Sequence, residues 1–214
     1  PARFLASVGE GERPAAEEMV RKIRLTDLYD ADLGMYKTSA SIEGESMEVG
    51  RVRAFTPGWL ERESIFLHME YKYLLGLLKA GLYQEFFEAM QEALIPYQDP
   101  GVYGRSILEN SSFIASSVNP DPDVRGQGFQ ARLSGSTVEA LTMWKRMVIG
   151  EGGFGTVNGA ENHGNDSFFR FAPVIPGRFF TEDGTFSYKL CSTCEVGPCS
   201  PAFRRRELLR KTAF

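Results

Sequence analysis

A helical apolar repeat between residues 60 and 79 is the feature that most restricts the fold. Apolar side chains recur at every fourth position in this range: Ile65, Met69, Tyr73 and Leu77. This spacing predicts an amphipathic helix, which Gly81 ends, and a similar repeat predicts a second helix over residues 83–94. Because only a few residues link the two helices, we expect them to pack as an antiparallel αα-hairpin.

Two further helices are predicted from the same kind of pattern. Pro14 opens a short helix over residues 15–23, as proline can in a first helical turn. A longer helix over residues 136–148 carries its apolar side chains at Val138, Leu141, Trp144 and Val148.

The remaining segments lack helical periodicity. Residues 1–14 indicate a connector, while residues 26–58 and 97–133 indicate polar loops, with a short strand in the first of them. The glycine-rich residues 151–155 are interpreted as a linker. Strands are predicted at residues 168–171 and 186–190, separated by turn residues. The sequence therefore predicts a mainly α domain over residues 1–150 and a β-rich cap and tail over residues 151–214.

Charge and hydropathy exclude two classes of partner. The net charge is -4 and the pI is about 5.4, with basic residues dispersed among acidic ones, so we expect no nucleic-acid binding. No apolar run reaches the about 18 residues that a membrane span requires. The N-terminal residues lack the apolar segment of a signal peptide. We therefore expect either a cytoplasmic protein or a chain whose true start is missing.

The cysteines do not predict a metal site. Cys191 and Cys194 have the spacing of zinc ligands and Cys199 follows, but a closed site needs four ligands and no histidine lies near. Reduced thiols are the favoured interpretation, and no metal or organic cofactor is expected. Of the two histidines, His163 stands in a polar turn and is expected to be solvated.

Three polar side chains form the first candidate site. On the predicted helix, Glu61, Ser64 and His68 are spaced i, i+3 and i+7, so they share a stripe. A carboxylate, a hydroxyl and an imidazole that converge can bind a polyhydroxylated or anionic ligand. Spacing alone favours the alternative, a partly buried polar row where the helix packs against a neighbour.

Two other segments offer ligand contacts. The sequence Arg132-Leu-Ser134-Gly135 precedes the helix at 136–148, and free backbone N–H groups at a helix start form an anion site. The same residue types also serve as an ordinary N-cap. Glu109 could accept a hydrogen bond from a sugar hydroxyl or cap a helix, and the sequence leaves both open.

These segments resemble a known enzyme family. Residues 57–68, Pro-Gly-Trp-Leu-Glu-Arg-Glu-Ser-Ile-Phe-Leu-His, are similar to the Pro-Gly-x-x-Glu-Asn-Gly-Gly-Ile-Phe-x-His segment of cellobiose-phosphorylase-type enzymes. Residues 132–137, Arg-Leu-Ser-Gly-Ser-Thr, resemble their Trp-Leu-Thr-Gly-Thr-Ala. Residues 173–188 resemble the strand-rich C-terminal cap of larger members. The likeness covers roughly residues 20–190 and looks closest to the branch near the β-glucan phosphorylases.

The resemblance implies part of an (α/α)6 barrel with attached β-structure. It implies reversible, inverting phosphorolysis of a β-glucoside or β-glucan to α-glucose 1-phosphate, with inorganic phosphate as co-substrate. His68, Ser134 and Gly135 match phosphate contacts, and Glu61 matches a glutamate on the acceptor side of the sugar. Ser64, Glu109 and Arg132 are the further substrate contacts that we expect. Phosphate is already a nucleophile, so an imidazole and a helix N-terminus can replace the second carboxylate of an inverting hydrolase.

The sequence also departs from the family pattern. Arg62-Glu63-Ser64 replaces Asn-Gly-Gly, and Glu63 would repel phosphate if it pointed inward. The general acid of the family is an upstream Asp that no segment here matches, and the barrel needs twelve helices where the sequence predicts four. We therefore expect a fragment, or a subunit that completes its barrel with another segment or chain. The alternatives are a non-catalytic chain for glycan binding or assembly, and an inverting glycoside hydrolase.

Overall fold

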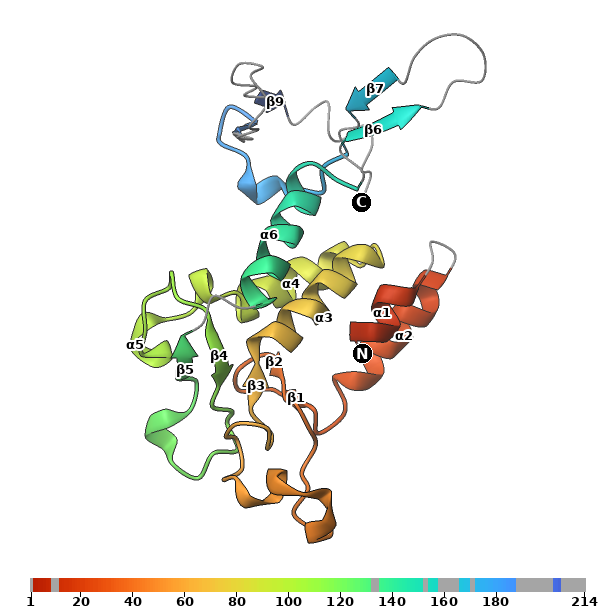
Figure 1. Ribbon diagram of the computed structural model, residues 1–214. Coiled ribbons are helices and arrows are strands. Elements are labelled where there is room, and N and C mark those ends of the chain that lie inside the picture. The colour runs from red at the N-terminus through yellow and green to blue at the C-terminus, as the bar shows by residue number, and fades with distance from the viewer. Residues whose placement is uncertain are drawn as a thin grey trace. The chain divides into compact units, whose positions relative to one another are not determined.

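The computed structural model describes residues 2–8, 12–131, 135–151, 154–157, 166–169, 172–187 and 202–204. Within these residues the chain is mainly helical and also contains small antiparallel sheets (Figure 1). It divides into unit 1, Pro1–Met143, and unit 2, Trp144–Phe214. Helix α6, Gly135–Val148, crosses this division. The sequence places the boundary between domains at residue 150 instead.

The predicted αα-hairpin is confirmed. Helix α3 spans Leu67–Lys79 and helix α4 spans Tyr83–Ala93. The chain reverses at residues 80–82, where Gly81 has a φ of 74°, and α4 packs along α3 (Figure 1). The two helices bury apolar side chains that form much of the core of unit 1: Leu74, Leu77, Leu78, Phe86, Phe87 and Met90.

The N-terminal residues form more helix than the sequence predicts. Helix α2, Arg13–Ile23, confirms the helix expected after Pro14. Helix α1, Ala2–Ser7, occupies a stretch predicted as a connector and packs on α3. Leu5 of α1 is fully buried, and a Cβ atom added to Gly76 of α3 would lie 2.8 Å from the Leu5 Cβ. The absence of a side chain at Gly76 therefore permits the close approach of the two helices.

Helix α3 begins seven positions later than predicted, at Leu67 rather than residue 60. Strand β3, Ile65–Phe66, precedes it and pairs with strand β4, Ser111–Ile114. Further upstream, Leu60 has a φ of 49° and Glu63 a φ of 58°. These left-handed values are incompatible with a right-handed helix. The prediction that Glu61, Ser64 and His68 share a stripe on one helix is therefore wrong.

A three-stranded antiparallel sheet combines residues from the start of the predicted helix at 60–79 with residues from the predicted loop at 97–133. Its order is β3–β4–β5, where β5 spans Gly128–Ala131. Phe66, Phe113 and Phe129 stand opposite one another across the three strands, and the Trp59 ring packs edge-on against Phe113 and Phe129. These aromatic contacts stabilise the sheet. A second small sheet pairs β1, Tyr29–Asp30, with β2, Met35–Tyr36. This second sheet agrees with the short strand expected within residues 26–58, whereas strands β4 and β5 lie in residues 97–133, which were predicted to be loop.

Helix α6 confirms the helix predicted at 136–148, but its buried face differs. Val138, Leu141 and Trp144 are exposed, although the sequence places them on the apolar face. Its buried apolar side chains are Met143, Met147 and Val148. The periodicity identified the helix correctly, whereas tertiary structure decides which side chains are covered.

Unit 2 contains two strand pairs among the described residues. Strand β6, Phe154–Val157, pairs with β7, Asp166–Phe169, so part of the predicted linker is a strand. Strand β8, Thr185–Ser187, pairs with β9, Ala202–Arg204. These strands agree in part with the predictions at 168–171 and 186–190, whose residues 170–171 and 188–190 lie outside the described residues.

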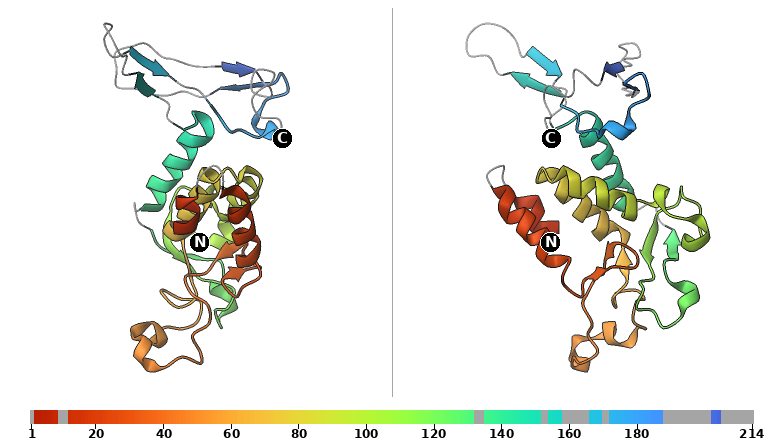
Figure 2. Two further views of the ribbon diagram at one scale, coloured as in Figure 1. Left: turned by 90° about the vertical axis from the view of Figure 1, so that its right-hand side faces the viewer. Right: turned by 180° about the vertical axis from the view of Figure 1, so that it is seen from behind.

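Short helical segments complete the described chain. Helix α5 spans Pro100–Tyr103. The 3-10 helices are η2 (Met47–Val49), η3 (Arg51–Ala54), η4 (Ile95–Tyr97), η5 (Pro122–Val124) and η6 (Gly177–Phe179). In unit 1, η2 and η3 lie at the end away from α1, α2 and α4, as both views of Figure 2 show. No helix in the described part of the chain is long and apolar enough to cross a membrane.

Candidate functional site

The segment that precedes α3 forms a tight turn rather than a helix. The Trp59 N–H donates to the Arg62 carbonyl and the Arg62 N–H donates to the Trp59 carbonyl, each at 3.1 Å. Glu61 lies at the tip of this turn, and its carboxylate forms an ion pair with Arg51 of η3. The Glu61 side chain is partly exposed, so it can reach a ligand from this loop.

Ser64 is fully buried and supports the turn. Its hydroxyl donates to the Leu60 carbonyl, and its own carbonyl accepts from the Thr38 N–H at 2.8 Å. The hydroxyl expected to contact substrate is thus directed at the protein backbone.

Behind the turn lies a buried group of three charged side chains, Lys37, Arg62 and Glu63. The Lys37 Nζ lies 3.7 Å from one Glu63 oxygen, and the Arg62 Nε lies 3.8 Å from the other. Arg62 also donates to the carbonyls of Arg53 and Phe55. Glu63 therefore points into a cationic environment within the protein, which removes the expected conflict with a bound anion.

His68 occupies the start of α3 and faces α6. Its Nε2 lies 3.8 Å from an oxygen of Glu139 in the second turn of α6, which is an ion-pair distance when the imidazole is protonated. The His68 side chain is 42 % exposed. The structure thus brings His68 close to the helix that begins at Gly135.

A chain of hydrogen bonds fixes the first turn of α6 to α3. The Ile95 N–H donates to the Tyr71 hydroxyl, and that hydroxyl donates to Asn110 Oδ1, both at 3.2 Å. The Asn110 amide then donates to Thr137 Oγ1 at 3.2 Å. Burial raises the pKa of the Tyr71 phenol, so this donor remains protonated. The hydroxyl of Thr137 accepts in this chain and can itself donate to a ligand oxygen.

Glu109 lies beside this chain, directly before Asn110. Its side chain is exposed and pairs with Arg105 at 3.5 Å, while its carbonyl accepts from the Tyr103 hydroxyl at 2.8 Å. The carboxylate is therefore accessible to a polar ligand. Arg132 and Ser134 lie outside the described residues.

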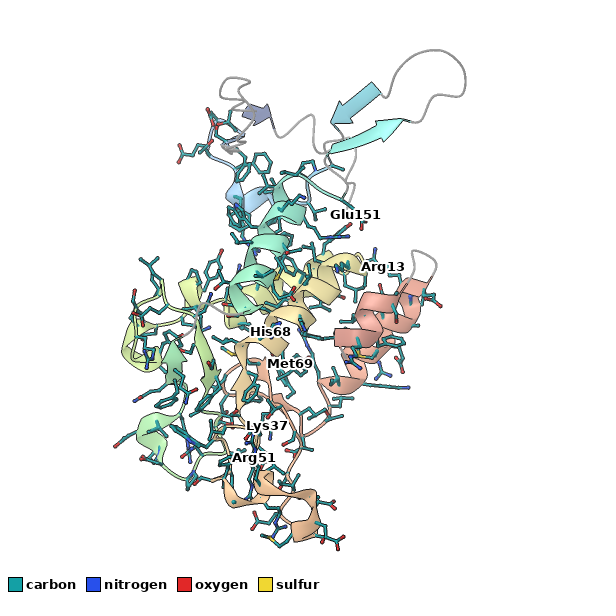
Figure 3. All side chains as sticks on the ribbon, viewed as in Figure 1. Arg13, Lys37, Arg51, His68, Met69 and Glu151 are labelled. Carbon is teal, nitrogen blue, oxygen red and sulfur yellow. The ribbon has the colours of Figure 1, made fainter. Side chains whose placement is uncertain are left out.

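The predicted site residues do not form a single cluster. Figure 3 shows His68 and Met69 at the start of α3, whereas Arg51, the partner of Glu61, lies on the far side of Lys37 from them. His68 belongs with the start of α6, and Glu61 belongs with the turn at 59–62. These are two polar regions connected by strand β3.

Sequence reasoning missed Glu139 as a neighbour of His68, and it missed the hydrogen bond between Asn110 and Thr137. Glu139 and Thr137 stand in the first turns of a helix that the sequence does predict, so a search for polar side chains there would have found them. Asn110 gives no comparable signal, because it lies 27 positions from Thr137 and only tertiary packing brings the two together.

Metal binding has no support from the described residues, which contain no group of three His, Cys, Asp or Glu side chains able to hold an ion. Cys191, Cys194, Cys199 and His163 lie outside the described residues. What the described groups offer chemically is an imidazole, hydroxyls and a helix start, all suited to an oxyanion.

Comparison with models of known protein families finds no match for this chain. Comparison with curated proteins finds no match either. The relation to phosphorylases therefore stays a prediction based on the two segments around His68 and Gly135.

Proposed function

We propose that this chain is part of an inverting β-glucoside or β-glucan phosphorylase and contributes the phosphate contacts and acceptor-side sugar contacts. The observation that carries the proposal is the proximity of His68 to the start of α6 through Glu139. The two segments that resemble the phosphorylases lie far apart in the sequence, and the contact of His68 with Glu139, two residues beyond the second segment, supports a shared location for them.

The phosphate region consists of His68, Ser134 and Gly135, with Thr137 as an added donor. An imidazole N–H and the N–H groups of a helix start donate hydrogen bonds to an anion without a metal ion. Such donors hold phosphate in line with the anomeric carbon, which supplies the positional part of catalysis. Glu139, 3.8 Å from the imidazole Nε2, can orient the ring.

The sugar contacts come from Glu61, Glu109 and Arg132. Glu61 is presented by the turn at 59–62, which the buried Lys37–Glu63 pair supports. The first Gly of the Asn-Gly-Gly pattern aligns with Glu63, whose φ is 58°. A left-handed backbone at the position where the family has glycine is consistent with a similar turn. The buried position of Ser64 argues for a supporting role instead of the substrate contact that we expected.

The wider proposal concerns architecture. The helices of residues 1–150 would form part of an (α/α)6 barrel, with the β-rich residues 151–214 as a cap. Another segment or chain would supply the general-acid Asp and the remaining helices. Phosphate-dependent release of α-glucose 1-phosphate from a β-glucan oligosaccharide, by the chain together with that partner in the cytoplasm, is the activity expected.

Calorimetric titration tests the phosphate site on the chain itself. We expect inorganic phosphate and α-glucose 1-phosphate to bind, and His68→Ala to weaken both by roughly tenfold or more, since a charged hydrogen bond is lost. His163→Ala, at the only other histidine, is the matched control and should bind normally. Equal binding by the His68 variant would refute the site, and so would phosphorolysis that survives this change unchanged.

A second candidate function is a non-catalytic assembly or glycan-binding chain. Val138 and Leu141 of α6 are 62 % and 65 % exposed, and Met69 beside His68 is also exposed. Val138 and Leu141, three positions apart on one helix, expose apolar surface that another protein surface could cover. Phosphate binding and turnover with a partner support the enzyme. Stable assembly with neither of them supports the second function.

A further inference from the structure

Glu70 is a buried carboxylic acid that plays no part in the proposed phosphate site. It stands in the first turn of α3 and is 2 % exposed. Its Oε2 accepts a hydrogen bond from the backbone N–H of Tyr36 at 3.0 Å, while Oε1 has no hydrogen-bond partner among the described residues. A single neutral donor is poor compensation for a buried ionised carboxylate.

The hydrogen bond from Tyr36 holds the segment that supports the turn at residues 59–64. Immediately after Tyr36, Lys37 pairs with Glu63. Thr38 donates its N–H to the Ser64 carbonyl and its hydroxyl to the Glu61 carbonyl, at 2.8 and 3.2 Å.

Two more contacts extend this support. The Ser39 hydroxyl accepts from the Glu63 N–H at 3.2 Å. Asp30, which pairs with Met35 in the β1–β2 hairpin, accepts from the Ser117 N–H at 2.8 Å. The hairpin thus connects Glu70 to the backbone that presents Glu61.

The surroundings of Glu70 disfavour its ionised form. The titratable or charged groups that influence it, or that share its cluster, are Glu92 of α4, Tyr29, Asp30 and Tyr36 of the hairpin, Tyr71 and Tyr73 of α3, and Arg24 after α2. Burial raises the pKa of Glu70 to about 8, the Tyr36 N–H opposes this, and the negative charge of Glu92 adds to it. The carboxyl is therefore neutral at pH 7.

We propose that Glu70 is a proton-sensitive anchor: its neutral carboxyl holds β2 on α3, and release of its proton to solvent loosens the turn at residues 59–64. The ionised side chain gains hydration only if it moves toward water or if water enters beside it. Either change weakens the contact with Tyr36 and the support that residues 37–39 give to Glu61 and Glu63. The anchor is a property of the chain's own conformation and requires no phosphate or glycan.

Trp59 reports directly on this turn. The chain has two tryptophans, so Trp144→Phe leaves Trp59 as the only indole. Trp144 is exposed, which makes this substitution mild. In this background we expect the emission of Trp59 to change between pH 6 and pH 9 with a midpoint near 8, as its packing on Phe113 and Phe129 loosens.

Three variants in this background test the assignment. Glu70→Gln cannot ionise and should abolish the transition. Glu92→Gln removes a like charge and should shift the midpoint to lower pH. Glu88→Gln, at an exposed position one turn earlier on α4, is the matched control and should leave the midpoint unchanged.

The outcomes separate this inference from the proposed function, because no ligand is present in the experiment. A transition that persists in Glu70→Gln would overturn the anchor, and so would a flat Trp59 signal in the parent protein. If the circular dichroism spectrum of Glu70→Gln at pH 7 differs from that of the parent, this variant does not fold normally. The shift of the transition midpoint in Glu92→Gln then tests the anchor instead. An unchanged midpoint in that variant would likewise overturn the anchor.

Discussion

Replacing Glu63 by glutamine removes one negative charge from the buried group formed with Lys37 and Arg62. The Glu63 and Lys37 side chains are 5 % and 3 % exposed, so water does not screen them. At the observed separations of 3.7 and 3.8 Å, each attraction is roughly 4 kcal/mol at an effective dielectric constant of about 20. Leaving a buried partner uncompensated typically costs about 3–5 kcal/mol.

Both cations keep a second partner in the variant. Lys37 retains Asp27 at 3.1 Å, and Arg62 retains Glu43 at 3.1 Å. We therefore expect Glu63→Gln to lower the free energy of unfolding by about 3 kcal/mol, at the low end of that range. Urea denaturation at pH 7, followed by circular dichroism, measures this directly.

A double-mutant cycle separates the ion pair from other effects of the substitution. Lys37→Met in the Glu63→Gln background should recover part of the loss, with a coupling energy of about 1–2 kcal/mol. Glu61→Gln is the matched control, because its ion pair with Arg51 is exposed and should contribute less than about 1 kcal/mol. A Glu63→Gln protein as stable as its parent would refute the idea that this buried group holds the turn.

Three other substitutions have defined outcomes in the same denaturation assay. Glu70→Gln tests the pH dependence of stability. Between about pH 4.5 and about pH 8, Glu70 is neutral in the folded chain and ionised in the unfolded chain, so the free energy of unfolding of the parent should fall by roughly 1.4 kcal/mol per pH unit as pH rises. Glu70→Gln should remove this slope, and parallel pH profiles of variant and parent would contradict the assignment. Gly76→Ala should destabilise by about 1–2 kcal/mol because its Cβ meets Leu5, and an unchanged stability would show that α1 packs elsewhere. Asp30→Asn should cost about 1–3 kcal/mol, since both carboxylate oxygens of Asp30 accept backbone N–H groups, and faster hydrogen exchange at Ser117 should accompany it.

The helices were largely predictable because their signals are local. The apolar repeat, Gly81 and the short link identified the α3–α4 hairpin from the sequence alone. The start of α3 could not be identified, because Ile65 and Phe66 suit both a helix and a strand. Their pairing with Ile114 and Phe113 depends on residues about fifty positions away. Leu60 and Glu63 also adopt left-handed conformations that their residue types do not suggest.

The sequence predicted which residues belong to the candidate site better than it predicted how they are arranged. His68 and the start of α6 were identified as separate polar segments, and their proximity through Glu139 follows from tertiary packing. Glu61 and Ser64 were assigned to the wrong geometry because a helical repeat was extended over a turn. The exposed face of α6 shows a related limit, since periodicity identifies apolar side chains without showing what covers them.

The central claim is that His68 and the start of α6 bind phosphate. The most direct test is imidazole ¹⁵N NMR during titration with inorganic phosphate, since the chain has two histidines and His163→Ala assigns them. We predict that the His68 resonances shift with saturating dependence on phosphate while those of His163 stay in place. Phosphate that leaves the His68 resonances unchanged, or that shifts only those of His163, would contradict the account.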